Sequence, residues 1–259
     1  MQTSDLTFSI VDDWAFSAAA DKAILMAVPP EIASIGAVVE LGRLALQYPS
    51  LVGPLAAIVE RHPLAPLVAP RERNRLIELG TGTGLVQLAA TPLPDAERTL
   101  LSIRAKSAAL TAGFAARSAS QLTAAMLEML DNVVEHSGAA HTKLIAYQAS
   151  LGQFTFVVAD SGMGALASLH ANPRFARLAS DRDALPLILQ DGCSRHVEPG
   201  HGKGFNDLFR GLADHNGTLR FRSGSAAVLI DGRSPDPLHP KLKAKAALRG
   251  FLESVSCTP

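Results

Sequence analysis

The segment from Leu127 to Ser137 constrains the fold most, because its apolar and polar residues separate when it is drawn as a helix. At 100° per residue, one side of this helix and its preceding turn is apolar and consists of Leu122, Met126, Met129, Leu130 and Val133. The adjoining stripe is polar and consists of Glu128, Asn132, Glu135 and His136. Such a helix packs on a core and presents a carboxylate, a carboxamide and an imidazole along one edge. Taken alone, a polar stripe of this kind is more typical of a solvated helix edge than of a site.

Three glycine-containing motifs follow this helix along the chain. An aromatic and β-branched run over 154–159 predicts a strand, and it ends in Asp160-Ser161-Gly162-Met163-Gly164. The second motif, Gly200-His201-Gly202-Lys203-Gly204, opens a predicted helix over 205–215. The third, Asn216-Gly217-Thr218, precedes a predicted strand over 219–223, and a further strand is expected over 226–230.

In this order, the helix and the motifs resemble the ATP-binding domain of DNA gyrase, the mismatch-repair ATPases, sensor histidine kinases and anti-sigma-factor serine kinases. This is the GHKL, or Bergerat-fold, superfamily, and the resemblance covers roughly residues 97 to 232. It implies an α+β fold: a two-layer α/β sandwich whose mixed, mostly antiparallel sheet carries helices on one face. The expected organisation is a mainly helical region over 1–95, an ATP-binding domain over 96–233 and a tail with a terminal helix over 234–259.

The resemblance assigns roles to individual residues around ATP and Mg²⁺. Adenine carries an amino donor, and Asp160 resembles the family's aspartate that accepts it. Gly162 and Gly164 would let the backbone approach the base and the ribose without a Cβ atom. Asn132 supplies an amide oxygen, a hard ligand suited to Mg²⁺. His136, on the same stripe, is expected beside the nucleotide.

The later motifs are expected to hold the phosphates. Backbone N–H groups at Gly200, Gly202 and Gly204 would face them, together with the positive end of the following helix and the ammonium group of Lys203. The family's threonine near the final strand has two possible counterparts, Thr218 and Ser225.

Glu128 separates the activities within the family. A glutamate four residues before the magnesium-binding asparagine polarises the attacking water or hydroxyl in the ATPases and serine kinases, whereas sensor histidine kinases usually lack it. The spacing of Glu128 and Asn132 therefore favours an anti-sigma-type kinase or an ATPase. We expect a regulatory protein that hydrolyses ATP or phosphorylates a protein partner on serine or threonine.

Two alternatives belong to other classes. The chain would be a non-catalytic, nucleotide-dependent switch if its helical amino-terminal region grips a partner. Alternatively, the run Glu78-Leu79-Gly80-Thr81-Gly82-Thr83-Gly84 is similar to the first motif of methyltransferases that use S-adenosylmethionine. No strand ending in an acidic residue follows at the required spacing, so a tight connection between two short strands is the preferred interpretation.

Composition limits the remaining possibilities. The 259 residues carry no formal net charge, so no global field favours nucleic acid or a membrane surface. No window approaches the ~20 apolar residues of a membrane span, and the amino terminus has no signal-peptide pattern. The two cysteines, Cys193 and Cys257, make no disulfide framework, which favours a cytoplasmic protein. The amino-terminal region either mediates a homodimer or packs on the ATP-binding domain.

Helices are further expected over 14–26, 31–47, 50–61 and 95–117, with a short strand over 6–11. Two paired strands are expected over 142–149 and 153–159. The segment 165–199 lies where the family keeps its mobile ATP lid, and it is expected to be partly helical. A helix over 241–255 should close the chain.

Overall fold

The computed structural model describes residues 5–26, 28–60, 75–78, 82–88, 93–136, 138, 143–188, 215–232 and 241–259. Its helices are α1 (Phe8–Ala19), α2 (Ile35–Ala45), α3 (Val52–Val59), α4 (Asp95–Thr111), α5 (Ala116–His136), α6 (Gly164–His170) and α7 (Asp181–Ile188), with short 3₁₀ turns η1 (Pro49–Leu51) and η3 (Pro173–Phe175). Its strands are β1 (Arg75–Glu78), β2 (Thr83–Leu88), β3 (Lys143–Ser150), β4 (Gln153–Asp160), β5 (Thr218–Asp231) and β6 (Lys241–Cys257).

The six strands form one sheet in the order β1-β2-β3-β4-β6-β5, and every neighbouring pair is antiparallel. The predicted α+β class is confirmed. The expected hairpin of β3 and β4 is also confirmed, with Ser150 opposite Gln153 across the turn at Leu151 and Gly152. Strand β6 lies between β4 and β5, so the last strand of the chain is central in the sheet.

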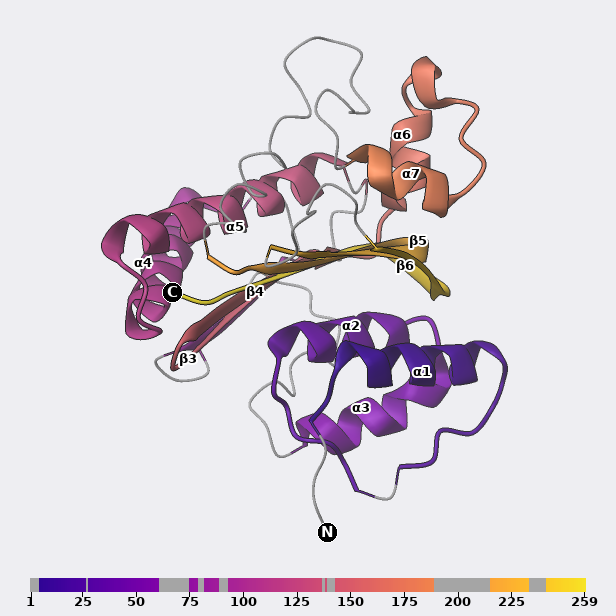
Figure 1. Cartoon of the computed structure of the whole chain (residues 1–259), viewed down its shortest axis with the longest axis horizontal. Helices are drawn as coiled ribbons and strands as arrows, with labels where there is room; N and C mark the ends of the chain where they lie inside the picture. Colours follow the sequence, from indigo (N-terminus) through magenta and orange to yellow (C-terminus); the bar gives the residue numbers. More distant parts are fainter. Residues whose placement is uncertain are drawn as a thin grey trace.

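Helices cover both faces of this sheet (Figure 1), whereas the sequence predicts helices on one face only. One hydrophobic core lies between the sheet and α4 and α5, and it includes Phe154, Phe156 and Val158 of β4. The other core lies between the sheet and α1, α2 and α3, and it includes Val157 and Ala159 of the same strand. Alternate residues of β4 therefore point to opposite helical layers, as the period of a strand requires. The amino-terminal helices thus add a third layer to the sheet and to the helices α4 and α5 on its other face.

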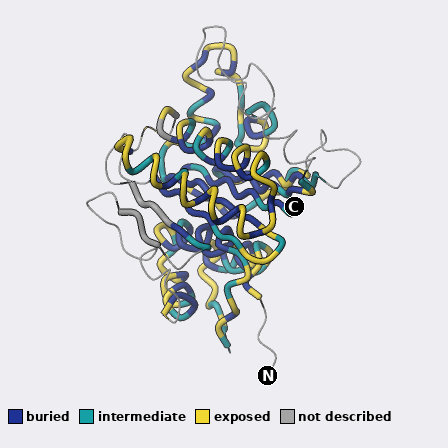
Figure 2. Tube along the Cα trace, turned by 90° about the vertical axis from the view of Figure 1, so that its left-hand side faces the viewer, coloured by how far each residue is buried: buried dark blue, intermediate teal, exposed yellow. Residues whose placement is uncertain are grey.

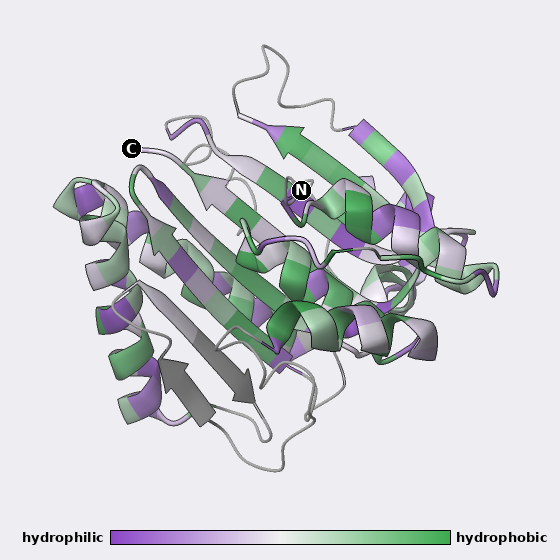
Figure 3. Ribbon diagram, turned by 90° about the horizontal axis from the view of Figure 1, so that it is seen from below, coloured by the Kyte–Doolittle hydropathy of each residue, from purple (hydrophilic) through white to green (hydrophobic). Residues whose placement is uncertain are grey.

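The amino-terminal helices thus pack on the rest of the chain, which was one of the two roles expected for them. Seen from the side of these helices, the strands behind them are largely apolar along the middle of the sheet (Figure 3). Buried residues gather in the sheet and on the inner sides of the helices in Figure 2. Because both faces of the sheet are covered here, every residue of β4 after Gln153 is buried, and so are Leu252 to Val255 in the second half of β6.

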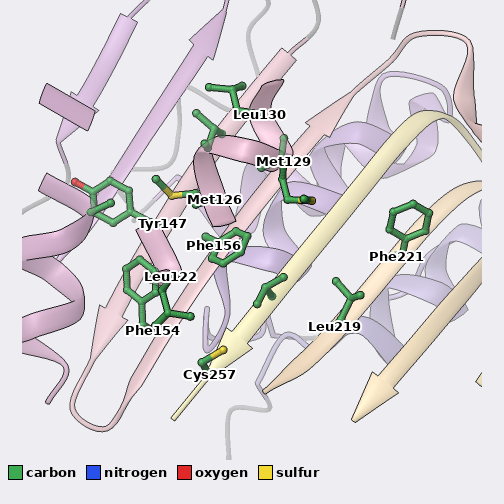
Figure 4. Close-up of a cluster of buried hydrophobic side chains, with 14 of the residues drawn as sticks. Leu122, Met126, Met129, Leu130, Tyr147, Phe154, Phe156, Leu219, Phe221 and Cys257 are labelled. Atoms are coloured by element: carbon green, nitrogen blue, oxygen red, sulfur yellow. The ribbon is translucent and has the colours of Figure 1, made fainter. Parts of the chain in front are cut away.

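Helix α5 packs as its periodicity predicts. Leu122, Met126, Met129, Leu130 and Val133 are all buried. Figure 4 shows four of these side chains, those of Leu122, Met126, Met129 and Leu130, in the cluster with Tyr147, Phe154 and Phe156 of the sheet. The adjoining polar stripe is consequently held at the flank of α5, on the same side of the sheet as this core.

Two segments have the wrong type of secondary structure, and the helix expected over 14–26 is shifted, since α1 runs from Phe8 to Ala19. The strand expected over 6–11 is the start of α1, because Thr7 caps this helix by accepting a hydrogen bond from the Ile10 amide. Val11, Ala15 and Ala18 are buried at helical spacing, so they form one face of α1.

The terminal helix expected over 241–255 is strand β6, which pairs with β5 along most of its length and with β4 over 251–257. The alanines and lysines of its first half favour a helix by propensity, but pairing in the sheet overrides this preference. The two short strands expected over 219–223 and 226–230 are one strand, β5, with a register shift around Gly224. The segment assigned to a tail is thus part of the sheet.

The glycine-rich run at 78–84 connects β1 and β2, which pair antiparallel with Glu78 opposite Gly84. This confirms the preferred interpretation of two short strands. A methyltransferase of the expected type needs a helix after the glycine turn and a parallel strand beyond it. The hairpin contradicts that alternative.

A buried group of charged side chains joins the amino-terminal helices to the sheet. Arg220 donates to Glu40 at 2.7 Å and to Asp12 at 2.7 Å. Arg222, which is fully buried, pairs with the same two carboxylates, and Lys245 pairs with Asp12. We refer to Asp12, Glu40, Arg220, Arg222 and Lys245 as the interlayer charge cluster. Its carboxylates come from α1 and α2 and its cations from β5 and β6, so it fixes the register between the two layers.

Replacing Glu40 with glutamine should destabilise the fold strongly. The substitution leaves the cations Arg220, Arg222 and Lys245 with only the carboxylate of Asp12 in a buried site. Breaking one partner of a buried pair costs about 3–5 kcal/mol of unfolding free energy. The measurement is urea unfolding at neutral pH.

Asp131→Asn is the matched control, because it breaks a bidentate pair with Arg98 in which both side chains are substantially exposed. That variant should lose less than about 1 kcal/mol. Equal losses in the two variants would show that the interlayer charge cluster does not hold the layers together.

Candidate functional site

Asp160 is the last residue of β4 and lies on the face of the sheet that α5 covers. The assignment of face follows from Phe154, Phe156 and Val158, which belong to the core beneath α5 at the same strand period. Only 2% of Asp160 is exposed. One carboxylate oxygen accepts a hydrogen bond of 2.6 Å from the Gly162 amide, so the turn that follows the strand fixes this side chain.

Burial dominates the electrostatics of Asp160. It raises the pKa of the carboxyl to about 6, while the Gly162 hydrogen bond and the charges of Arg43 and Lys143 work in the opposite direction. At neutral pH, Asp160 is therefore a carboxylate that accepts hydrogen bonds. A buried acceptor at the end of a central strand is the kind of group that recognises a donor on a ligand.

Arg43 reaches this turn from α2, in the amino-terminal layer. Its guanidinium donates a weak hydrogen bond of 3.5 Å to the Ser161 hydroxyl. Burial lowers the pKa of Arg43 to about 10, and the charge of Asp160 partly offsets that effect. Lys143 begins β3 on the neighbouring strand, and burial lowers the pKa of its ammonium group as well. Both cations were missed from the sequence, because they lie far from Asp160 along the chain.

The backbone around this turn is packed as closely as the glycines predict. A Cβ atom at Gly250, whose φ is +85°, would lie 2.3 Å from the Asp160 carbonyl oxygen. Gly164 has a φ of +76°, and its own Cβ would lie 2.8 Å from the Ser223 hydroxyl. That hydroxyl donates to the Gly250 carbonyl at 2.8 Å and accepts from the Ala165 amide at 2.8 Å. Strands β5 and β6 are thereby tied to the turn after Asp160.

The predicted residues of α5 lie along the flank of that helix. Glu128 is exposed and Asn132 is half-buried, with its amide nitrogen 4.0 Å from the Met129 sulfur. His136 is the last residue of α5, and its side chain lies outside what the structure describes. The apolar stripe of α5 packs on the Asp160 face, so Glu128 and Asn132 belong to the same layer as Asp160.

Glu253 on β6 is a second buried acid that the sequence analysis missed. It has no exposed surface, and neither carboxylate oxygen has a hydrogen-bond partner. Burial, and secondarily the charge of Glu128, raise its pKa to about 8. The signal in the sequence was an acidic residue within the mostly apolar run Phe251-Leu252-Glu253-Ser254-Val255. We predicted a helix for this segment, and in a helix Glu253 would not have been identified as buried.

Other residues predicted for the site do not lie near Asp160 in the described part of the structure. Thr218 starts β5 opposite Ser256, at the far end of the sheet from Ser223, which is the β5 residue in line with Asp160. Ser225 bonds the carboxylate of Asp181 through its amide and its hydroxyl. Gly200, Gly202, Lys203 and Gly204 lie outside the described residues. The segment expected to be a lid is helical in its described part, as α6 and α7.

We compared the sequence with models of protein families and with curated proteins. No family model matches this sequence, and no curated protein matches it. Among the residues described, no group of three or more histidine, cysteine, aspartate or glutamate side chains could hold a metal ion. Within the same residues, none of the helices has the length and apolarity that crossing a membrane demands.

The buried Glu253 carboxyl should make the protein less stable as pH rises. Its pKa is raised from an ordinary 4.5 to about 8, so between these values the unfolded chain releases a proton that the folded chain retains. The free energy of unfolding therefore falls over this window, and the fall ends above about pH 8. Glu253→Gln removes this contribution, which is on the order of a few kcal/mol.

The measurement is urea unfolding of both proteins at several pH values between 4.5 and 9. We expect the unfolding free energy of the variant to increase relative to that of the wild type as pH rises. Asp160 is present in both proteins, so its own titration cancels in the difference. A constant difference across the range would mean that Glu253 titrates normally in the folded protein.

Proposed function

We propose that this chain binds ATP with Mg²⁺ between the flank of α5 and the turn that follows β4, as a regulatory protein of the Bergerat-fold type. The observation that carries the proposal is the buried carboxylate of Asp160, fixed by the Gly162 amide at the end of a central strand and facing the layer of α5. The exocyclic amino group of adenine is the donor that this acceptor would bind. The proposal extends to a protein partner as phosphoacceptor or regulatory target.

The arrangement of the elements supports this proposal. The helix with Glu128 and Asn132 is followed, after strand β3, by the strand that ends in Asp160 and by the glycine turn, and α5 packs on this strand in the fold. Gly164 and Gly250 let the turn after β4 pack directly against β5 and β6, which fixes the backbone that carries Asp160. Helices α6 and α7 follow at the place expected for a lid.

The proposed chemistry is transfer or hydrolysis of the terminal phosphoryl group. Glu128 would accept the proton of the attacking water, or of a serine or threonine hydroxyl. The oxygen of that nucleophile would bond to the γ-phosphorus while the bond to the β–γ bridging oxygen breaks. Asn132 would hold Mg²⁺ through its amide oxygen, and the ion would neutralise charge on the phosphates.

Asp160→Asn should weaken ATP binding by tenfold to a hundredfold. The amide retains an acceptor for the Gly162 N–H but has no charge to offer the adenine amino group, and a hydrogen bond to a charged group contributes about 1.5–3 kcal/mol. The measurement is calorimetric titration with ATP and Mg²⁺. Asp131→Asn, the same substitution on the outer side of α5, should bind like the wild type. Unchanged affinity in Asp160→Asn would remove Asp160 from the site.

Glu128→Ala should abolish turnover while leaving the affinity for ATP within about threefold of the wild type, because a general base contributes 10²–10⁴-fold to rate. The measurement is release of inorganic phosphate, with and without candidate protein partners. Turnover that survives at the wild-type rate would refute the role assigned to Glu128.

A second candidate function is a nucleotide-dependent switch without catalysis. The observation in its favour is Arg43, which connects the amino-terminal layer to Ser161 directly after Asp160. A ligand at Asp160 would thereby act on the layer opposite α5. Stoichiometric binding of ATP by the wild type, with no turnover by either the wild type or Glu128→Ala, would favour the switch.

A further inference from the structure

Glu253 is a neighbour of Asp160 on the face of the sheet that forms part of the candidate site. On β4 and β6, Asp160 is opposite Phe251 and Val158 is opposite Glu253. The two acids are therefore diagonal neighbours on one face of the sheet, with Cα atoms about 7–8 Å apart by the geometry of antiparallel strands. Phe251 and Val255, which flank Glu253 at the strand period, belong to the core beneath α5, so Glu253 faces the same layer as Asp160.

The carboxyl of Glu253 has no hydrogen-bond partner in the part of the chain that the structure describes. It is fully buried, and neither oxygen accepts or donates a hydrogen bond. Buried polar groups in native proteins are almost always hydrogen-bonded, and those that are not tend to mark functional positions. The interlayer charge cluster shows the contrast, since both carboxylates there are paired with cations. The missing hydrogen-bond partner of Glu253 would therefore be a group on a bound ligand.

The two acids offer complementary groups at neutral pH. Asp160, with a pKa of about 6, is a carboxylate and accepts hydrogen bonds. Glu253, with a pKa of about 8, carries a proton and can donate one. A 6-aminopurine presents a donor, the amino group, beside an acceptor, the ring nitrogen N1. A 6-oxopurine presents the reverse arrangement at the same two positions.

We propose that Glu253 is a second base-reading residue, which donates its carboxyl hydrogen to N1 of the 6-aminopurine whose amino group Asp160 accepts. This inference rests on the proposed function and specifies the base that the site selects. Because Glu253 has no exposed surface, the base reaches it only after the groups that cover this carboxyl move aside.

The experiment compares ATP with 1-deaza-ATP, in which a C–H group replaces N1 and the amino group remains. Calorimetric titrations with Mg²⁺ use the wild type, Glu253→Gln and Glu253→Leu at pH 7. The wild type should bind the deaza analogue roughly tenfold more weakly than ATP, the usual effect of one lost hydrogen bond. Glu253→Gln should keep this preference, because its amide still donates. Glu253→Leu should bind both nucleotides equally.

A pH series on the wild type provides a second measurement that needs no leucine variant. Above pH 9 the ionised carboxyl has no hydrogen to donate, so the preference for ATP should vanish in the wild type and persist in Glu253→Gln. Among the described residues, the charge of Glu128 on α5 acts on Glu253, and Asp160 lies diagonally across from Glu253 on β4. Asp160, whose pKa is about 6, is already ionised at pH 7, so its charge stays the same over this range. Both acids are also present in Glu253→Gln, which therefore controls for their effect.

The outcomes separate the two proposals. A wild type that binds neither nucleotide refutes the proposed function itself. A wild type that binds ATP and 1-deaza-ATP equally, or a leucine variant that retains the preference for ATP, refutes the role of Glu253 and leaves nucleotide binding in place. Thermal unfolding of each variant confirms that the titrated protein is folded.

Discussion

The burial of both faces of the central strands is the constraint on which the rest of this structure depends. Strands β4 and β6 have helices above and below, so a polar side chain on either strand or on the adjoining β5 enters a core. On the face toward α1 and α2, the fold pairs Arg220 and Arg222 with Asp12 and Glu40. On the face toward α5, Asp160 accepts from a turn amide, and Glu253 has no hydrogen-bond partner among the described residues. Burial therefore pairs the charged groups on one face, whereas on the other face it leaves two acids that we propose as ligand-binding groups.

The amino-terminal layer is connected to the candidate site at the end of β4. Arg43 of α2 meets Ser161 at the edge of the sheet, and its charge lowers the pKa that burial raises at Asp160. The interlayer charge cluster fixes α1 and α2 against β5 and β6, and this keeps Arg43 in place. A change in how these helices dock would consequently alter the electrostatics of Asp160. Under the proposed function, this connection would link a partner that contacts the amino-terminal helices to a nucleotide on the opposite face.

The sequence allowed prediction wherever the signal was local. The apolar stripe of α5, the β3–β4 hairpin and the strand pair around Gly82 follow from periodicity and turn residues within a few positions. Strand β6 could not be predicted in this way, because alanine and lysine favour a helix locally. Only pairing with β4 and β5 makes the segment a strand. For the same reason Glu253 was missed, since its burial depends on neighbours that are distant along the chain. Arg43 likewise reaches Asp160 only after α2 packs on the opposite face.

We propose that one adenine nucleotide lies between α5 and the turn after β4, with its base on Asp160. A crystal structure of the protein with Mg²⁺ and a non-hydrolysable ATP analogue tests this binding mode most directly. We expect the exocyclic amino group within about 3.2 Å of the Asp160 carboxylate. A nucleotide bound at any other surface, with Asp160 contacting only the Gly162 amide, would contradict it.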